Sequence, residues 1–426
     1  MRILIMGSPT SNGLRCFGKN YKICGGGWVE NLIKNLLNKD NIEICSCFYG
    51  DFVKNPMIEE YENVKYAVLP IRVKGLKSCN NKMIEDLKYI FLTLSPDIVH
   101  IIGTERNYNL KMLEIVGINK SIISITGMVS YISNHYYAGI DEKNFKIKSI
   151  GDVLRNGGPI NERKDFIKYG ISEEKLIKKA KYVTGRTTWD YACVKQINPN
   201  IDYVYCSEIL NSLYYENKWE FSKIKRYRIF ISQASYPLKG FHQLLIALPM
   251  ILMNYPDTEI YVAGANIFKN TGLIDRIKRT TYSKYLIRII KKLKIPMDKI
   301  HFTGPLDSKE MLEQYLKANI FVLPSAIENS PNSLGEAMIL GMPCVASCVG
   351  GVQDMIRDKV DGFLYPFNEP YMLAYYICKI FENDNLAIEL GKKAHESALI
   401  RFNVDKIVDT TVKLYEKVLK ENDNYE

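Results

Sequence analysis

The sequence is poor in features that mark secreted, metal-binding and membrane-spanning proteins. Its ten cysteines are scattered, with no C-x-x-C pair and no accompanying histidine spacing. Disulfide bonds and structural zinc are therefore not expected, and a reducing cytoplasm fits best. No apolar run approaches the roughly 18 residues that span a bilayer. The opening residues 1–7 are too short for a signal peptide and predict a first strand instead.

Motifs that several other protein classes need are absent as well. No D-x-D motif stands at a strand end and there is no H-E-x-x-H, so these residues require no metal. The glycines at 25–27 lead into a helix but form no G-x-G-x-x-G, and no acidic residue follows about 20 positions on, which disfavours a nicotinamide dehydrogenase. Basic residues are not interleaved with aromatics along one stretch, so nucleic acid is not expected as a partner.

The composition describes a soluble globular protein with an anionic partner. The chain has 426 residues, 47% of them apolar, which is too long for one ordinary core and predicts two or three domains. A net charge of +10 favours a nucleotide, a lipid phosphate or a membrane surface as partner. The 29 tyrosines serve either core packing or carbohydrate stacking.

Strand-like and helix-like stretches alternate along the chain. In the first half the expected strands are residues 2–6, 42–49, 97–102, 121–126, 182–184 and 202–206. In the second half they are residues 228–232, 258–263, 299–303, 320–323, 344–347 and 363–365. The helices between them, notably 238–253, 272–293 and 309–317, indicate βαβ units on mostly parallel sheets. We therefore predict an α/β fold: two Rossmann-like domains facing each other across a cleft, at residues 1–206 and 228–403, with a linker at 207–227.

Two glutamates eight positions apart are the most informative feature of the second half. Glu328 follows the apolar run at 320–323, which predicts a buried parallel strand, and Glu336 falls in the first turn of a helix expected from Leu334. Open α/β sheets bind their ligands at the carboxyl ends of the strands. A carboxylate there accepts hydrogen bonds from sugar hydroxyls, and a helix N-terminus suits a phosphate. By itself such a pair also fits a simple helix-dipole contact.

With these residues the chain resembles the retaining glycosyltransferases of family 4, which have the GT-B fold. Glu328 and Glu336 match the E-x7-E signature of that family, and Gly350 and Gly351 follow beyond the next strand. The sequence from Ser330 to Ala337 is most similar to that of bacterial enzymes that build cell-surface polysaccharides. The resemblance implies a GT-B architecture whose terminal helix, 404–426, returns to the first domain.

The resemblance also implies how the donor is bound. Glu336 would hold the ribose hydroxyls and Glu328 the sugar hydroxyls, while Lys239 would contact the donor diphosphate. The family carries an arginine near this lysine, and Gln233 stands in its place here, a weaker partner for an oxyanion. The remaining donor-binding residues expected are Asn332, Ser333, Leu334, Gly350, Gly351, Gly304, Gly26 and Gly27.

Two histidines are weaker candidates. The family often has a histidine where residues 125–127 end the fourth strand, and this chain has none there. His135 either occupies that space or is an ordinary loop histidine, and His100 fits a core histidine better than a catalyst. The expected Gly350-Gly351 turn either forms an anion-binding concavity or is only a tight strand-to-helix turn.

We therefore expect a cytoplasmic, metal-independent, retaining glycosyltransferase without a cofactor. It would move a hexose-type sugar from a nucleoside diphosphate-sugar to a saccharide or lipid-linked acceptor. Peripheral contact with anionic membrane at the inner face is an alternative role for the basic stretch 276–294, whose apolar positions equally suit packing on a sheet. The rival functions are a sugar-nucleotide epimerase of the same fold, which would need acid-base residues that five histidines hardly supply, and a non-catalytic nucleotide-sugar-binding protein.

Overall fold

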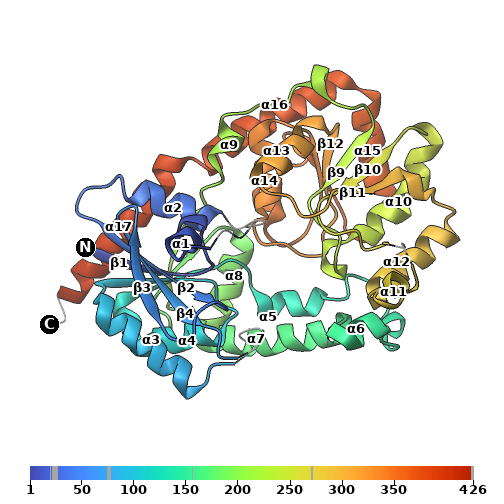
Figure 1. Cartoon of the computed structure of the whole chain (residues 1–426). Coiled ribbons are helices and arrows are strands. Elements are labelled where there is room, and N and C mark those ends of the chain that lie inside the picture. Colours follow the sequence, from blue (N-terminus) through green and yellow to red (C-terminus); the bar gives the residue numbers. More distant parts are fainter. Residues whose placement is uncertain (20, 22–26, 74–77, 156, 270–271, 424–426) are drawn as a thin grey trace. The chain divides into compact units, whose positions relative to one another are not determined.

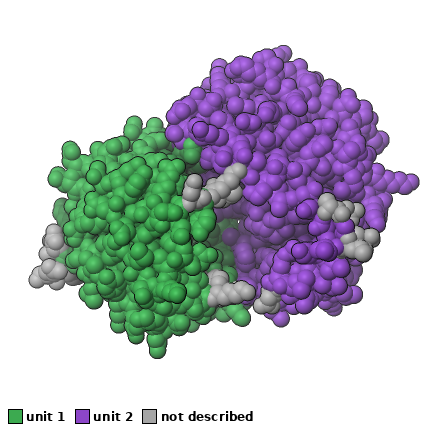
Figure 2. Space-filling model, in the orientation of Figure 1, with its two compact units in different colours: residues 1–131, 167–211, 402–426 green, residues 132–166, 212–401 purple. Residues whose placement is uncertain are grey.

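The computed structural model divides the chain into two compact units (Figures 1 and 2). It describes residues 1–19, 21, 27–73, 78–155, 157–269 and 272–423. Unit 1 comprises residues 1–131, 167–211 and 402–426, and unit 2 comprises residues 132–166 and 212–401. Residues 132–166, expected in the first domain, thus belong to the second.

Unit 1 is built on an eight-stranded sheet in the order β3-β4-β2-β1-β5-β6-β7-β8. Its strands are β1 (Arg2–Met6), β2 (Glu43–Gly50), β3 (Met57–Tyr61), β4 (Val64–Pro70), β5 (Ile98–Ile102), β6 (Ser121–Ser124), β7 (Tyr182–Gly185) and β8 (Asp202–Tyr205). Every pairing is parallel except β3 with β4. That hairpin was not anticipated. Its turn is Glu62-Asn63, both at positive φ, the conformation of tight hairpin turns.

Helices cover both faces of the unit 1 sheet. They are α1 (Ser11–Cys16), α2 (Trp28–Leu36), α3 (Asn81–Leu94), α4 (Asn107–Val116), α8 (Thr188–Ile197) and α17 (Val404–Asp423). Along β1, Ile3 and Ile5 pack with α2 and α17, whereas Leu4 and Met6 pack in the opposite core with α3 and α4. This alternation follows from the two-residue period of a strand. Two further helices, α5 (Val129–Ile132) and α7 (Pro159–Lys179), have residues in both units.

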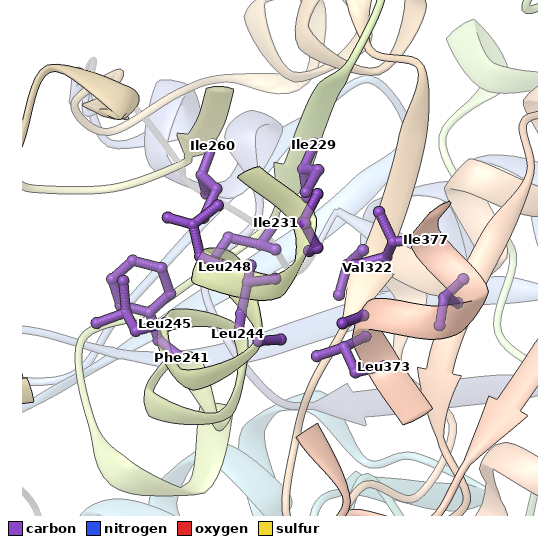
Figure 3. Packing of buried hydrophobic residues seen from close by; sticks show 14 of the residues in the cluster. Ile229, Ile231, Phe241, Leu244, Leu245, Leu248, Ile260, Val322, Leu373 and Ile377 are labelled. Carbon is purple, nitrogen blue, oxygen red and sulfur yellow. The ribbon is translucent and has the colours of Figure 1, made fainter. Parts of the chain in front are cut away.

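Unit 2 is built on a six-stranded, wholly parallel sheet in the order β11-β10-β9-β12-β13-β14. Its strands are β9 (Arg228–Ile231), β10 (Glu259–Val262), β11 (Ile300–Phe302), β12 (Ile320–Leu323), β13 (Cys344–Ser347) and β14 (Phe363–Tyr365). Its helices are α6 (Ile150–Arg155), α9 (Ser212–Tyr215), α10 (Phe241–Asn254), α11 (Leu273–Ile277), α12 (Thr281–Lys292), α13 (Ser308–Lys317), α14 (Asn332–Leu340), α15 (Pro370–Glu382) and α16 (Asp384–Arg401). Figure 3 shows α10 and α15 packing their leucines against β9 and β12.

The segment 132–166 is fixed to unit 2 by core packing and by one buried histidine. Ile140 and Phe145 are buried in the core formed by β9, α10 and α12. His242, on α10, bonds through Nε2 to the carbonyl oxygen of Ala138 at 2.9 Å. Burial lowers the pKa of His242 to about 4, so the ring is neutral near pH 7 and can donate a single N–H to that carbonyl.

The helix expected over 272–293 is broken into α11 and α12. Thr280 is the reason, because its side chain accepts a hydrogen bond from the backbone N–H of Ser283 and caps a new helix. Asp152 of α6 accepts hydrogen bonds from the backbone N–H and the hydroxyl of Thr281, which ties this cap to α6. No helix among the described residues is long and apolar enough to cross a membrane.

Candidate functional site

The carboxyl ends of β9 and β12 are neighbours in the unit 2 sheet. Strand order reverses between them, since β10 and β11 continue from β9 on one side and β13 and β14 from β12 on the other. The crevice at such a reversal is where open α/β sheets bind ligands. The loop after β9 carries Gln233 and Lys239, and the loop after β12 carries Glu328. The topology therefore brings these expected site residues to one place.

Lys239 and Glu328 form an ion pair at this reversal. Lys239 Nζ donates to Glu328 Oε1 at 2.6 Å, and Ser325 Oγ donates to the same oxygen at 2.7 Å. Burial by itself lowers the pKa of Lys239, but the charge of Glu328 and the phenol of Tyr236 outweigh it and raise that pKa, so the amine is charged. The two side chains are 23% and 14% exposed, which keeps the pair within reach of a ligand. Both contacts fall on Oε1, which leaves Oε2 to accept from another donor.

Glycines hold the two loops together. Gly240 has φ +66°, and a Cβ there would lie 1.6 Å from the carbonyl oxygen of Pro324. Gly350 has φ +50°, and its Cβ would lie 2.1 Å from the carbonyl oxygen of Glu328, to which the N–H of Gly351 donates at 3.0 Å. The expected anion-binding role needs correction for Gly351, since its N–H serves the chain's own backbone. The glycine pair positions Glu328.

Glu336 is held by two tyrosines. Helix α14 begins at Asn332 rather than at Leu334, so Glu336 lies in the second turn and not, as expected, in the first. The hydroxyl of Tyr315 donates to Glu336 Oε2 at 2.9 Å, and Tyr214 also hydrogen-bonds the carboxyl. Burial raises the pKa of Glu336 to about 7, although both tyrosine hydrogen bonds act to lower it. Near neutral pH the Glu336 carboxyl is therefore protonated in some molecules and ionised in the others.

This shifted pKa gives a pH-dependent prediction. Because the folded chain holds the Glu336 proton more tightly than the unfolded chain, this carboxyl stabilises the fold most below its ordinary pKa, and that contribution is lost as pH rises through about 7. If the carboxylate accepts ribose hydroxyls, affinity for a nucleoside diphosphate rises over the same range. Between pH 6 and 8 the gain for the wild type should exceed that for Glu336→Gln by up to about tenfold, measured by calorimetry. Parallel pH profiles would show that Glu336 does not face the nucleotide.

The two tyrosines could not be assigned from the sequence. Tyr315 stands 21 residues before Glu336, and Tyr214 lies on α9, inside the stretch expected as a linker. No spacing rule links either tyrosine to the glutamate, because the contact depends on how α9, α13 and α14 pack. The only available signal was the unusually high number of tyrosines.

The other expected donor-binding residues of unit 2 lie at the same edge of the sheet. Ser333 Oγ accepts a hydrogen bond from Ser232 Oγ at 3.1 Å, which ties the start of α14 to the loop after β9. Gln233 is exposed and donates to Ser235 Oγ at 3.1 Å. Gly304 has φ +82° and pairs with Gly264 after β10. Asn332 and Leu334 open α14, and the Leu334 side chain is buried.

His135 belongs to unit 2. It is exposed and lines a pocket of about 410 Å³ together with Ala326, Tyr137, Phe367 and Asn368. Ala326 stands on the loop that carries Glu328, and its N–H donates to the carbonyl oxygen of Leu238 at 2.7 Å. The segment 132–166 therefore brings this histidine to the same group of loops as the ion pair. Sequence order alone did not place His135 in unit 2.

Apart from His135, the expected residues of the first half lie in unit 1 or outside the described residues. His100 is buried on β5, and its two ring nitrogens contact Tyr415 OH and Ser124 Oγ, each at 2.7 Å. Burial lowers its pKa to about 4, so it is a neutral core histidine and is withdrawn as a catalytic candidate. Gly27 is the exposed N-cap of α2. Gly26 lies outside the described residues. Within those residues, no group of three or more histidine, cysteine or acidic side chains could hold a metal.

Comparisons with known proteins agree with this geometry. Residues 215–397 match the model of the family described as glycosyl transferases group 1. The chain is 27% identical over 139 residues to N-acetyl-alpha-D-glucosaminyl L-malate synthase of Bacillus anthracis, which covers 33% of this chain and 36% of that protein. The chain thus spans about a third of that curated relative's length.

Two solved structures align over nearly the whole chain. Sucrose-phosphate synthase from Thermosynechococcus elongatus has a TM-score of 0.73 and 16% identity, covering 99% of both chains. HepE from Anabaena, solved in complex with UDP and glucose, has a TM-score of 0.65 and 15% identity, covering 98% of this chain and 99% of that one. At this identity the likeness concerns the fold, and it confirms the predicted GT-B class with its two Rossmann-like domains.

Proposed function

We propose that the chain transfers a sugar from a nucleoside diphosphate-sugar to a saccharide or lipid-linked acceptor, in polysaccharide or glycoconjugate biosynthesis, because residues 215–397 match the model of the glycosyl transferases group 1. The observation that carries the proposal is the pair of Lys239 and Glu328 at the strand-order reversal of unit 2. A cation for a diphosphate stands there directly beside a carboxylate for sugar hydroxyls. Uridine diphosphate sugars are the first donors to test, since HepE was solved with UDP and glucose.

The proposed roles follow from charge and position. Lys239 neutralises the charge that develops on the leaving diphosphate, where a preorganised cation is most effective. Glu328 accepts hydroxyls of the transferred sugar through Oε2 while Lys239 and Ser325 hold Oε1. Glu336, deeper in unit 2, accepts the ribose hydroxyls. Asn332 and Ser333 add the N-terminus of α14, which favours a phosphate.

We further propose that transfer retains the configuration of the sugar and needs no metal. In this scheme the acceptor hydroxyl attacks on the face from which the diphosphate departs, and the leaving phosphate oxygen takes the acceptor proton. No enzyme nucleophile or general base is then required, which suits two loops that bring together a lysine, a carboxylate and hydroxyls. Lys239 takes the charge-neutralising role that a divalent cation has in other transferases.

The two glutamates should fail in different ways. Glu336→Ala is expected to weaken the binding of uridine diphosphate, because each hydrogen bond to a charged group contributes about 1.5–3 kcal/mol. Glu328→Ala should lower turnover more than nucleotide affinity, because it contacts the sugar. Calorimetry with uridine diphosphate and initial rates of sugar transfer separate the two effects, and transfer should persist within about twofold in a chelator. Equal losses of nucleotide affinity in both variants would contradict this division.

The same assay separates transfer from the rival functions. A transferase releases nucleoside diphosphate in proportion to the acceptor supplied. A sugar-nucleotide epimerase changes the donor with no acceptor present, and a binding protein releases nothing. Donors are ranked first by thermal shift of the whole chain, and the best is then assayed with soluble saccharides and with lipid-linked acceptors.

A further inference from the structure

Two short helices of unit 2, α6 and α11, expose apolar side chains to solvent. On α6, Ile150, Val153 and Leu154 share one face and are exposed, while Gly151 and Asp152 are buried. A surface helix normally turns its apolar stripe inward. The exposed large apolar residues of this region, here named the apolar patch, are Ile147, Ile150, Val153, Leu154, Ile274 and Ile277.

Backbone contacts hold α6 against the end of α11, through the face of α6 that carries Gly151, Asp152 and Arg155. Gly151 lies against the backbone of Lys278, where a Cβ would come within 2.3 Å of the carbonyl oxygen. Arg155 donates to that same carbonyl oxygen at 2.9 Å. Asp152 and Ser149 bond to Thr281, at the start of α12. Figure 1 places α6, α11 and α12 next to one another.

The rim of the apolar patch is mainly basic, although the acidic Asp275 lies on α11 between Ile274 and Ile277. Lys146, Lys148, Arg155 and Lys278 are exposed, and none of them forms an ion pair within the part of the chain that the structure describes. Asp152, the acidic residue of α6, is buried and bonded to Thr281, so it does not offset these charges at the surface. Ile147 is 87% exposed and stands between Lys146 and Lys148.

We propose that the apolar patch and its basic rim dock unit 2 on an anionic phospholipid membrane. Aliphatic side chains enter the boundary of the acyl chains while flanking lysines and arginines reach the phosphates, which is how interfacial helices bind. A second copy of the chain fits less well, because protein interfaces favour aromatic residues and are depleted in lysine. The charges complement anionic lipid, and two copies of this basic rim would repel each other. The chain's net charge of +10 acts in the same direction.

Helix α12, the basic stretch considered first, is not this surface. Its apolar residues Leu286 and Ile290 are buried in the unit 2 core, and its basic residues are therefore only the solvated face of a packed helix. The docking surface lies beside it, on α6, α11 and the turn at Ile147. This inference concerns attachment and does not rest on the proposed sugar transfer.

Co-sedimentation of the whole chain with phospholipid vesicles tests the proposal. Wild type is expected to sediment with vesicles of phosphatidylcholine plus phosphatidylglycerol and far less with phosphatidylcholine alone. Ile147→Ser with Leu154→Ser should lower partitioning by about tenfold or more, since the apolar insertion is lost. Lys146→Gln with Lys148→Gln should lower binding to the anionic vesicles by about tenfold.

A matched control uses exposed apolar residues elsewhere in unit 2. Met253→Ser with Ile400→Ser, on α10 and α16, removes equally exposed side chains and should leave vesicle binding unchanged. The proposal is overturned if the Ile147/Leu154 variant sediments like wild type, or if wild type is a dimer in sedimentation velocity that this variant dissociates. Uridine diphosphate binding is measured on every variant. If the wild type binds nucleotide and transfers sugar but does not sediment with vesicles, the membrane-docking proposal is wrong and the proposed sugar transfer still stands.

Discussion

Lys239→Ala is expected to lower the turnover of sugar transfer by about 100- to 1000-fold, the cost of losing one charge-stabilising contact at a transition state. The effect should be severe here because Gln233 stands where the resembled family has an arginine, so Lys239 supplies the expected side-chain charge. Initial rates at saturating donor measure it, with uridine diphosphate affinity determined separately. Lys239→Arg, which keeps the charge, is the control and should retain more activity than the alanine variant.

The substitution Gln233→Arg tests whether position 233 faces the diphosphate. Gln233 is exposed and bonded to Ser235, so a guanidinium at position 233 has room to reach the same oxygens in a fork. Gln233→Arg should restore part of the turnover in the Lys239→Ala background, measured as a four-way cycle. Ser235→Arg, an arginine at an exposed position of the same loop, should restore nothing. If Gln233→Arg restores no turnover in the Lys239→Ala background, Gln233 does not face the diphosphate. The alignment of this loop with the resembled family is then wrong.

Gly240→Ala should destabilise the chain by about 2–5 kcal/mol, through left-handed strain together with overpacking. Its φ is +66°, and the new Cβ would lie 1.6 Å from the Pro324 carbonyl oxygen, so the loop that carries Glu328 must move. Both thermal stability and uridine diphosphate affinity are therefore expected to fall.

The matched control for this glycine is Gly117→Ala in unit 1. Gly117 has φ +90° but no atom within 4 Å of the added Cβ. It should cost only the backbone strain of a glycine conformation at φ +90° and ψ 157°, about 1–3 kcal/mol, and leave nucleotide affinity unchanged. Similar losses of melting temperature in the two variants would show that contact with Pro324 is unimportant.

Local patterns were enough to determine the architecture and the outline of the site. The strands of unit 2 were predicted to within a residue or two, because buried parallel strands are short apolar runs between glycines and prolines. Glu328 and Lys239 were both placed on loops after strands, which depends only on recognising β9 and β12. Their contact follows once those two strands are neighbours.

The β3–β4 hairpin and the break between α11 and α12 depend on local turns and caps, which the periodicity of apolar residues does not predict. The hairpin of β3 and β4 turns on Glu62-Asn63, where two residues with positive φ replace the usual glycine. The break between α11 and α12 depends on the Thr280 cap, which competes with an otherwise continuous helical pattern. In both places the side chains fit either outcome, and one local hydrogen bond or turn decides between them.

The sequence by itself determined the α/β class and most of the strands, and it placed Lys239 and Glu328 on loops that follow strands. Only the tertiary structure decided that residues 132–166 belong to unit 2, that Tyr214 and Tyr315 hold Glu336, and that the apolar face of α6 points to solvent. Strand and loop positions follow from neighbours along the chain, whose periodicity is written in the sequence. The three features that the tertiary structure decided depend on contacts between segments far apart in the sequence. Those contacts are set by which surfaces bury the most apolar area when helices pack.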